Sequence, residues 1–499
     1  MDFLSGILFL LLTWTLIQAL HSIVKRSKAI PQKLPPGPKP IPIIGNLLEL
    51  GDKPHRSLAK LAKTHGPIMS LKLGQITSVV VSSATMAKEV LQTHDQFLSN
   101  RTIPDCIRAH NHQNFGLPWL PVSTQWRVLR KICNSELFAI KILDANQHFR
   151  RKKVQELLSE VHKSSLAGDA VDIGRAAFKT TLNLLSNTIL SMDLADPNSD
   201  TARVYKEIVW NIMEEAGKPN LGDYFTILKK VDFQGIRQRM TIYFGKILDL
   251  FDGIVNQRLQ FRKSPSSIAS DDMLDNLLNI SEENSGEIDK SQIVHLLLAL
   301  FVAGTDTTSS TVQWAMAELL HNPETLSKAR EELEQTIGKG NPIEESDIAK
   351  LPYLQAIVKE TFRLHPTVPL LLPHKAETDV EISGFTVPKG AQVLVNAWAI
   401  GRDPSIWDNP DSFMPQRFLG SEIDFRGRSF ELIPFGSGRR ICPGLPLAIR
   451  MVHLMLGSLV HSFDWKLEVG VTPKNMNMEE KFGITLDMAQ PLRAFPIPF

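Results

Sequence analysis

The chain has 499 residues, is 43% hydrophobic and 22% charged, and carries a formal net charge of +2. So small a charge excess gives no reason to expect a nucleic-acid partner, and the length is sufficient to bury a large core. The three cysteines, Cys106, Cys133 and Cys442, form neither a CxxC pair nor a disulfide framework, which favours a reducing environment that faces the cytosol.

At the N-terminus, residues 3–24 contain no Asp, Glu, Lys or Arg, and the basic run KRSK follows them at 25–28. About 20 apolar residues span a bilayer core, and a basic flank stays on the cytosolic side. A cleaved signal peptide is the alternative, but its apolar region has only about 7–15 residues and is followed by small residues. We therefore expect residues 1–24 to be an uncleaved anchor in a lipid bilayer.

A proline-rich segment, LPPGPKPIP, follows at 34–42. Proline fixes the backbone angle φ and cannot continue a helix, so we expect residues 25–42 to form a basic flank and a stiff hinge that lifts the body off the membrane. No internal repeat and no linker interrupts residues 43–499, which we expect to form one domain.

Strands are predicted in two parts of this domain. The segment 68–83 reads as a strand pair with its turn at Gly74 and Gln75, and the segments 380–390 and 391–398 read as further strands. These strands are few and short for a chain of this length. We therefore expect the β-structure to be confined to small sheets at one side of the molecule.

The remaining sequence has mostly helical periodicity. The segment 322–338 predicts a helix that Asn322 caps and Gly338 ends. The segment 287–321 predicts a longer helix, which should run through the core because its centre is apolar almost all round. The fold class is therefore mainly α-helical with small β-sheets.

Inside the long predicted helix stands the sequence AGTDTT, at 303–308. Gly304 should loosen the helix, and threonine hydroxyls can bond back to backbone carbonyls and bend it. Asp306 is costly in an apolar helix unless it has a partner. One interpretation is a kink with an exposed aspartate; the other is a groove for a small ligand, in which the acid Asp306 and the alcohol Thr307 handle protons.

Cys442 stands in the sequence PFGSGRRICPG, at 434–444, directly before an apolar helical segment at 445–460. A lone cysteine is usually a small buried hydrophobe. Here the glycines let the backbone approach a flat partner, and a thiolate ahead of a helix has its pKa lowered by the helix dipole. Arg440 can pair with a carboxylate. A thiolate beside such an arginine suits a haem with its propionates.

Two other cofactors fit this segment poorly. Zinc needs further soft ligands, and no second or third one stands near Cys442. A dinucleotide-binding loop needs a third glycine, and Ile441 occupies that place in GSGRRI.

Two further motifs carry little information when each is taken alone. Glu360 and Arg363, in KETFR, lie three residues apart on one predicted helix face, where a surface pair contributes a few tenths of a kcal/mol. Arg417 lies in the proline-bounded loop MPQRF at 414–418.

In this order along the chain, these motifs resemble those of the cytochrome P-450 monooxygenases over nearly the whole sequence. The haem signature Phe-x-x-Gly-x-Arg-x-Cys-x-Gly is met in full by residues 435–444. The resemblance implies a haem b whose iron has Cys442 as its axial ligand. It also implies a core locked by Glu360, Arg363 and Arg417, and a proton-handling pair formed by Asp306 and Thr307.

The resemblance further places four residues on the haem propionates, which are Trp126, Arg130, Arg440 and His374. Two positions depart from the family pattern. Gln416 stands where an acid is usual, and we expect it to be tolerated. His374 stands where an arginine is common, which would make the propionate contact sensitive to pH.

The anchor, the hinge and the run EKFGITL at 480–486 look like those of a plant endoplasmic-reticulum member of the family with its catalytic domain in the cytosol. Longer runs, including HGPIMSLKLGQIT and FELIPFGSGRRICPGLPLA, resemble the geraniol 8-hydroxylase group. This implies hydroxylation of geraniol, and of nerol, at the allylic C8 methyl. The alternatives are hydroxylation of another terpenoid, such as a diterpene, or a haem-thiolate isomerase or dehydratase that needs no reductase. Such isomerases tend to lose the acid–alcohol pair, which this chain keeps.

The chain has no nicotinamide or flavin fingerprint, so electrons from NADPH would arrive through NADPH-cytochrome P-450 reductase. Candidate docking residues are Arg127, Lys131, Arg439 and the run RRKK at 150–153, for which a solvated helix face is the alternative. By family position, a small apolar substrate would contact ten residues: Phe115, Leu117, Phe301, Ala303, Val368, Leu370, Leu371, Leu372, Phe482 and Ile484.

Overall fold

The computed structural model describes residues 33–195, 201–263, 272–283 and 288–498, together with Thr13. Apart from Thr13, the expected anchor at 1–24 lies outside the described residues, and so does the part of the basic flank before residue 33.

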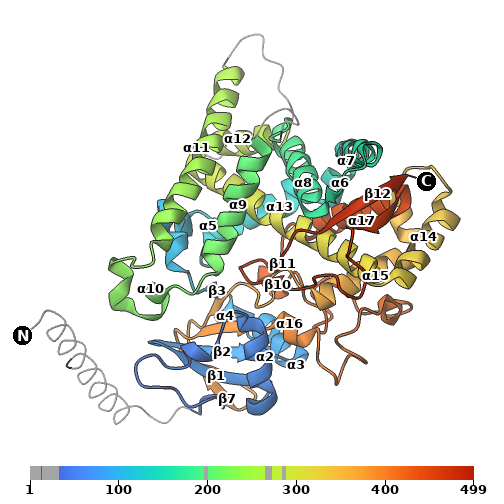
Figure 1. The fold of residues 1–499 in the computed structure, drawn as a ribbon. Helices are drawn as coiled ribbons and strands as arrows, with labels where there is room; N and C mark the ends of the chain where they lie inside the picture. Colours follow the sequence, from blue (N-terminus) through green and yellow to red (C-terminus); the bar gives the residue numbers. More distant parts are fainter. Residues whose placement is uncertain (1–12, 14–32, 196–200, 264–271, 284–287, 499) are drawn as a thin grey trace, which may run out of the picture.

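The described residues form a mainly helical body with several small sheets, as expected from the sequence (Figure 1). The longest helix, α13, runs from Lys290 to His321. The other α-helices are α2 (Pro54–His65), α3 (Ala84–Lys88), α4 (Asp95–Leu98), α5 (Thr124–Ile132), α6 (Ile140–Ala145), α7 (Gln147–Ala167), α8 (Ile173–Leu190), α9 (Thr201–Gly217), α10 (Leu221–Tyr224), α11 (Ile236–Arg262), α12 (Met273–Glu283), α14 (Pro323–Ile337), α15 (Pro352–Leu364), α16 (Ala397–Ile400) and α17 (Leu445–Ser462).

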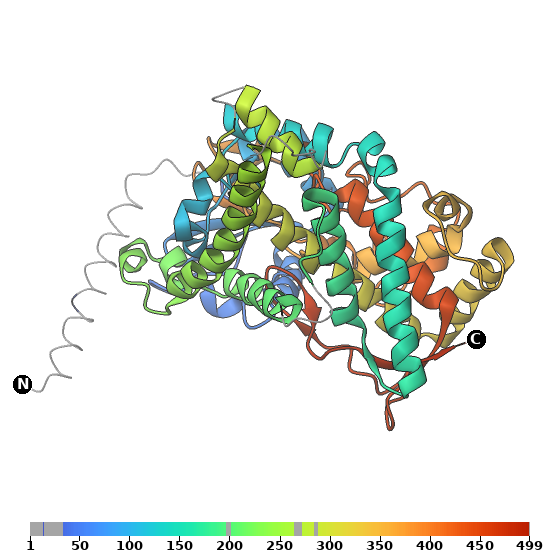
Figure 2. The same ribbon diagram turned by 90° about the horizontal axis from the view of Figure 1, so that it is seen from above.

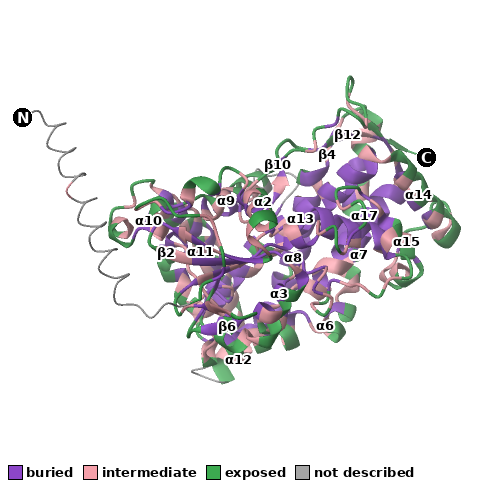
Figure 3. Ribbon diagram, turned by 90° about the horizontal axis from the view of Figure 1, so that it is seen from below, coloured by how far each residue is buried: buried purple, intermediate pink, exposed green. Residues whose placement is uncertain are grey.

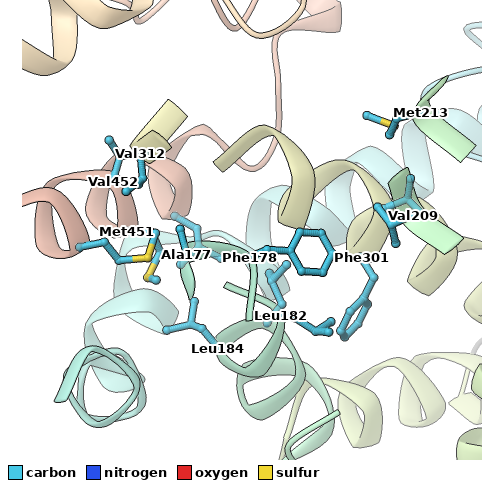
Figure 4. Packing of buried hydrophobic residues seen from close by; sticks show 14 of the residues in the cluster. Ala177, Phe178, Leu182, Leu184, Val209, Met213, Phe301, Val312, Met451 and Val452 are labelled. Carbon is cyan, nitrogen blue, oxygen red and sulfur yellow. The ribbon is translucent and has the colours of Figure 1, made fainter. Parts of the chain in front are cut away.

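Helix α13 passes through the middle of the body, as its all-round apolar sequence predicts (Figures 1 and 2). It starts with a capping box, in which Asp289 and Gln292 bond each other's backbone N–H groups. Helices α8, α11, α15 and α17 pack against it. Figure 4 shows side chains of α8, α9, α13 and α17 in the buried cluster.

The largest sheet has five strands in the order β1-β2-β8-β5-β3. The pair β1 and β2 is antiparallel and turns at Gly74 and Gln75, as predicted, and β8 joins β2 in parallel. These strands are β1 (Ile68–Leu73), β2 (Ile76–Val81), β3 (Asn100–Arg101), β5 (His374–Lys375) and β8 (Gln392–Val395).

The prediction from the sequence that all the small sheets lie at one side of the molecule is wrong. The hairpin of β6 (Val380–Ile382) and β7 (Phe385–Val387) belongs to the end of the molecule that carries β1 and β2. A three-stranded sheet instead packs on α7 and α17, because the last strand of the chain returns there (Figure 1). Its strands are β4 (Val171–Asp172), β9 (Phe463–Leu467) and β12 (Arg493–Pro498), and a separate hairpin is formed by β10 (Glu480–Lys481) and β11 (Asp487–Met488).

The described part of the proline-rich segment is extended, as predicted, but it is not a free-standing stalk. Ser70 of β1 donates its backbone N–H to the Pro36 carbonyl at 2.9 Å and its hydroxyl to the Pro35 carbonyl at 2.6 Å. A Cβ on Gly37 would lie 1.9 Å from the Ser70 carbonyl oxygen, so glycine permits this contact. The hinge therefore lies along the edge of the sheet.

Helix α14 ends at Gly338 as predicted, whereas Asn322 does not cap it by its side chain. The Asn322 amide donates to the Glu318 carbonyl at 2.8 Å. Because Asn322 is the only residue between α13 and α14, its amide satisfies the end of α13 instead.

Two helices among the described residues, α13 and α17, are long and apolar enough to span a membrane. Both are mostly buried in the body, where Figure 3 shows them largely in purple. Their composition is therefore that of core helices.

Candidate active site

Cys442 lies in a loop between a short 3-10 turn, Gly438–Arg440, and the start of α17. Its backbone N–H donates to the Phe435 carbonyl at 3.0 Å, which closes the loop. Gly438 has a φ of +65°, and a Cβ there would lie 1.9 Å from the Leu91 carbonyl oxygen. This glycine therefore serves the contact of the loop with residues 89–93, rather than the approach of a flat partner.

The Cys442 side chain faces a cavity with an empty volume of about 1750 Å³, counting its open mouth; we call it the Cys442 cavity. Its walls come from α5, α8, α13, the start of α17 and the segment 367–374, and most of the lining side chains are apolar. Burial raises the pKa of the Cys442 thiol, although the backbone N–H groups of Gly444 and Leu445 lower it. The predicted lowering of the thiol pKa by the helix end is thus present, but burial outweighs it. A bound metal ion would deprotonate the thiol.

Three guanidinium groups and one imidazole line this cavity, and no Asp or Glu does so among the described residues. Burial, together with the nearby Arg440, lowers the pKa of Arg101 to about 9. Burial likewise lowers the pKa of Arg440 to about 10, with Arg130 adding to the effect. The cavity thus concentrates uncompensated positive charge that an anionic group would stabilise.

The arginines differ in how many of their donors are free. Arg440 donates to the Ser99 carbonyl at 2.9 Å and to the Leu120 carbonyl at 2.6 Å, and its guanidinium lies 4.6 Å from the Trp126 ring centroid. It therefore ties the surrounding loops together. Arg130 has no hydrogen bond or ion pair among the described residues, and the buried Arg101 Nε is also without a partner there.

Arg101 is a site residue that the sequence did not reveal. It belongs to none of the haem-site motifs, and only the two-residue strand β3, paired with β5, brings it to the cavity wall. The same pairing places it opposite His374.

His374 lines the cavity and is buried. Its Nδ1 lies 2.7 Å from the Leu98 carbonyl, so Nδ1 carries the proton and Nε2 is an acceptor in the neutral ring. Burial lowers the pKa of His374 well below its usual range, and Arg101 lowers it further. The pH sensitivity of a contact between His374 and a propionate stays a prediction.

The residues of this cavity fit the haem that the sequence motifs imply. A flat macrocycle suits the apolar walls, and its two propionates suit a cluster of guanidinium groups that have no acidic partner among the described residues. Cys442 supplies the one soft ligand, and the described residues contain no group of three His, Cys, Asp or Glu side chains that could hold a metal ion by itself.

Asp306 and Thr307 lie on α13, which is helical throughout. The Thr307 hydroxyl lines the Cys442 cavity and donates to the Ala303 carbonyl at 2.8 Å, the back-bond that the sequence predicts. A Cβ on Gly304 would lie 2.9 Å from Leu185 Cδ1. Gly304 therefore allows α8 to approach closely, rather than loosening the helix.

Asp306 is buried but lies away from the Cys442 cavity. It lines a second space between α8, α9, α13 and the β10–β11 hairpin, which we call the Asp306 cavity. Its Oδ2 has no hydrogen-bond partner among the described residues. Burial raises the pKa of Asp306 well above its usual range, and Asp487 raises it further. The acid and the alcohol thus face different cavities.

Glu360 and Arg363 form a fully buried ion pair, not a surface pair. Arg363 donates to both Glu360 oxygens, at 2.7 and 2.8 Å, and Arg417 donates to Glu360 Oε1 at 3.1 Å. The remaining Arg363 donors reach backbone carbonyls of the loop at 401–412. Gln416 is exposed, which explains why an acid is dispensable there.

Of the ten residues expected around the substrate, two line neither the Cys442 cavity nor the cavity next to it, which is described below. Phe115 stacks on His295 at a centroid distance of 4.7 Å, and Phe301 packs on Phe251 at 4.9 Å. Phe301 precedes Ala303 by two residues, about 200° around the helix, and so faces α11 instead. Six line the Cys442 cavity: Leu117, Ala303, Val368, Leu371, Leu372 and Ile484.

The remaining two, Leu370 and Phe482, line a separate space beside β1 and β2, which we call the outer cavity. Five residues line both cavities, so the two are neighbours: Arg101, Val368, Leu371, Leu372 and Ile484. The sequence also gave no signal for Leu185 of α8 and Met213 of α9, which line the Cys442 cavity from segments without motifs.

The profile of the family described as Cytochrome P450 matches residues 35–491. Geraniol 8-hydroxylase of Swertia mussotii is 60% identical over 497 residues, covering 100% of this chain and 99% of that protein. Geraniol 8-hydroxylase of Catharanthus roseus is 60% identical over 496 residues, covering 99% of each. Drimenol monooxygenase of Persicaria hydropiper is 54% identical over 470 residues, covering 94% of this chain and 93% of that protein. The chain belongs to the cytochrome P450 family.

Proposed function

We propose that this protein is a haem-thiolate monooxygenase that hydroxylates geraniol, and also nerol, at the C8 methyl. Electrons would come from NADPH through a separate reductase. The observation that carries the proposal is the Cys442 cavity, in which one thiol and three guanidinium groups surround an apolar space. The full-length similarity to two geraniol 8-hydroxylases supports the choice of substrate.

Cys442 would hold the haem iron through Sγ, and Arg101, Arg130 and Arg440 would bind the propionates. When bound, haem supplies the activation of dioxygen and the hydroxylation of a C–H bond. Glu360, Arg363 and Arg417 lie outside the cavity and would keep α15 and the loop at 401–418 in place behind it.

The substrate would lie against the apolar part of the Cys442 cavity, formed by residues such as Ala303, Val368, Leu372 and Ile484. Geraniol has one hydroxyl group, so most of its affinity must come from burial, at about 25 cal/mol per Å² of apolar surface. A shift of a few ångströms, which is roughly the length of two C–C bonds, would present a different carbon to the reacting centre. The shape of these walls therefore decides which carbon is hydroxylated, and the weak allylic C–H bonds favour C8 once it is close.

Asp306 and Thr307 would supply protons for the reaction. Thr307 lies at the wall of the Cys442 cavity, whereas Asp306 faces a cavity with charged walls. The two residues are neighbours in sequence, so α13 would connect an aqueous side to the reacting side.

The reductase would dock on the exposed face of α5. Trp126 and Arg130 of this helix line the Cys442 cavity, whereas Arg127 and Lys131, one position further along, are exposed. A basic surface on the helix that borders the cofactor suits an acidic electron donor.

Two other expected docking candidates are less suitable. In the run at 150–153, Arg150 and Lys153 are buried and are engaged in ion pairs with Glu345 and Asp193, so only half of the run is on the surface. Arg439 is exposed but is paired with Asp95 at 2.9 Å.

The protein would be anchored in the endoplasmic-reticulum membrane by residues 1–24, with 25–42 as flank and hinge and 43–499 as the catalytic domain in the cytosol. Four large apolar residues are exposed around α10, next to the outer cavity. They would rest on the bilayer, from which an apolar substrate could enter: Leu221, Ile227, Val231 and Phe233.

The sequons at Asn100 and Asn279 test this orientation. Sugar is attached only in the lumen, so both sites should stay unglycosylated in a eukaryotic host. Sugar on either asparagine would place the catalytic domain in the lumen.

The substrate is tested by reconstituting the full chain with the reductase, NADPH and geraniol, and by identifying the products by mass spectrometry. We expect 8-hydroxygeraniol. Ala303→Leu narrows the Cys442 cavity and should change the ratio of products, whereas Phe301→Leu, a matched change on the same helix but outside the cavity, should keep that ratio.

A larger terpenoid should be supplied in a parallel reaction, because a drimenol monooxygenase is 54% identical to the chain. Efficient turnover of that substrate without 8-hydroxygeraniol would make the protein a hydroxylase of another terpenoid. A product formed without NADPH or oxygen would instead indicate an isomerase or dehydratase.

A further inference from the structure

The Asp306 cavity has an empty volume of about 1690 Å³, counting its open mouth. Asp306 lies buried in its wall with one carboxylate oxygen unpaired, and a second carboxylate, that of Asp487, lines the same space from β11. Asp487 lies in no motif and has no role in the function proposed above.

The position of Asp487 relative to Asp306 is fixed by α13 itself. The Ser310 hydroxyl and the Trp314 Nε1–H both donate to the Leu486 carbonyl, at 3.2 and 3.1 Å. Because Asp306, Ser310 and Trp314 are spaced four residues apart, they lie on one face of the helix. Leu486, the residue directly before β11, is thus attached to the same face of α13 that presents Asp306.

Charged groups line the Asp306 cavity from every element around it. Half-buried Lys206 of α9 is the cation whose charge acts on both carboxylates, and burial lowers the pKa of Lys206 itself. Its ammonium lies 5.8 Å from the Phe178 ring centroid. The other charged groups that line the cavity are Asp172, Arg175 and Lys179 at the start of α8, Arg203 and Glu207 of α9, and Lys481 of β10.

Two carboxylates in a largely buried space cannot both be ionised without a large cost. Burial raises the pKa of Asp487, as it does that of Asp306, while Lys206 lowers the pKa of both. Asp306 is the more deeply buried of the two, because it is 5% exposed whereas Asp487 is half-buried. Burial therefore favours the protonated form of Asp306 more than that of Asp487.

We propose that Asp487 is a positioning residue for proton transfer, whose negative charge keeps a proton on Asp306 at neutral pH. This rests on the proposed monooxygenase function, in which that proton is consumed on the Thr307 side of α13. When the proton leaves, the carboxyl O–H bond of Asp306 breaks and a carboxylate remains. Water in the Asp306 cavity then returns a proton, so the step involves no oxidation or reduction.

Infrared spectroscopy of the haem-loaded protein in detergent tests the proposal without turnover. We expect the C=O band of a protonated carboxyl at neutral pH, and this band should be lost in Asp306→Asn. Asp487→Asn removes the neighbouring negative charge, so the midpoint at which the band disappears should shift by about one pH unit to lower pH. Asp487→Glu should retain the wild-type midpoint.

Lys206→Met provides the matched opposite change. It removes a positive charge that favours the ionised carboxylates, so the midpoint should shift to higher pH. Loss of packing alone would not produce shifts of opposite sign in Asp487→Asn and Lys206→Met. The absorption band of the reduced carbon monoxide complex should be the same in all variants, which shows that each is folded around its haem.

The pH dependence of product formed per NADPH consumed should shift in the same directions. The proposal is overturned by the absence of an Asp306 band in the wild type, by an unchanged midpoint in Asp487→Asn, or by shifts of the same sign in the two variants. If the pH midpoints of the infrared band shift as expected but the protein hydroxylates no terpenoid, the effect of Asp487 on Asp306 is supported and the proposed function is rejected.

Discussion

Asp306 and Thr307 are consecutive residues of α13, yet their side chains lie in two different cavities. Successive residues of an α-helix point about 100° apart, so a helix that runs through the core can present neighbouring side chains to opposite compartments. Here one compartment is lined by carboxylates and cations, and the other by Cys442 and mostly apolar side chains. Helix α13 thus forms the wall between a polar cavity and the proposed reaction cavity.

This separation predicts different effects for Asp306→Asn and Thr307→Ala. Both should lower the product formed per NADPH consumed and increase the release of peroxide, because each interrupts proton supply. Only Thr307→Ala should also change the optical shift on substrate binding, since only Thr307 lines the Cys442 cavity, in which we propose that the substrate binds. Thr305→Ala is the control, because the Thr305 hydroxyl makes the same kind of back-bond, to the Phe301 carbonyl at 2.7 Å, outside both cavities. Wild-type coupling in both test variants would contradict the proposed roles.

Replacement of Cys442 by Ala should abolish the thiolate-type absorption band of the reduced carbon monoxide complex. Cys106→Ala is the matched control, because Cys106 is buried in the core away from the cavity and should keep the band. Difference spectra of the two purified variants provide the measurement. A persistent band in Cys442→Ala would show that another residue holds the iron.

Glu360→Gln should destabilise the protein by ~3–5 kcal/mol, because it leaves the buried Arg363 without its counter-charge. Equilibrium unfolding in denaturant measures this loss. The exposed pair Arg493 and Glu468 is the control, and Glu468→Gln should cost less than about 1 kcal/mol. Equal effects of the two substitutions would mean that the buried network does not lock the core.

His112 and His295 predict a loss of stability in acid. Their Nδ1 atoms lie 2.9 Å apart in the core, and burial lowers the pKa of His112 to about 3 and that of His295 to about 4. The unfolded chain, with histidine pKa values of about 6.5, binds protons that the native state does not. The native state should therefore lose stability as the pH falls from about 6.5 towards about 4.

The free energy of unfolding, measured at about pH 7 and about pH 5, checks this expectation; each histidine contributes up to about 1.4 kcal/mol per pH unit. The double substitution His112→Asn, His295→Asn keeps one hydrogen bond without a titrating group, so its stability should depend less on pH. Some dependence should remain, because burial also lowers the pKa of His453 to about 4. An equal pH dependence in the wild type and the double variant would contradict the assignment.

Features set by local sequence could be predicted, and features set by distant contacts could not. The apolar run of α13 and the glycine turn between β1 and β2 were predicted correctly, because each depends on neighbouring residues alone. The location of the sheet formed by β4, β9 and β12 was not, because it joins residues more than 280 positions apart in the chain, such as Val171 and Ala494.

The site shows the same division. Cys442, Arg440 and Trp126 were found because their motifs keep a fixed spacing, and the structure places all three at one cavity. Arg101 was missed because only strand pairing brings it there. Phe115 and Phe301 were wrongly placed in the pocket, because the direction of a side chain depends on what packs around it, which spacing does not reveal.

An isotope experiment shows whether the protein inserts one atom of dioxygen into geraniol. The reconstituted enzyme and reductase are supplied with oxygen gas enriched in a heavy isotope, and the mass of the product is measured by mass spectrometry. We expect 8-hydroxygeraniol that carries one heavy oxygen atom, at C8, and retains its original hydroxyl oxygen. A product without the label would show that the new oxygen comes from water, and that the protein is not a monooxygenase of geraniol.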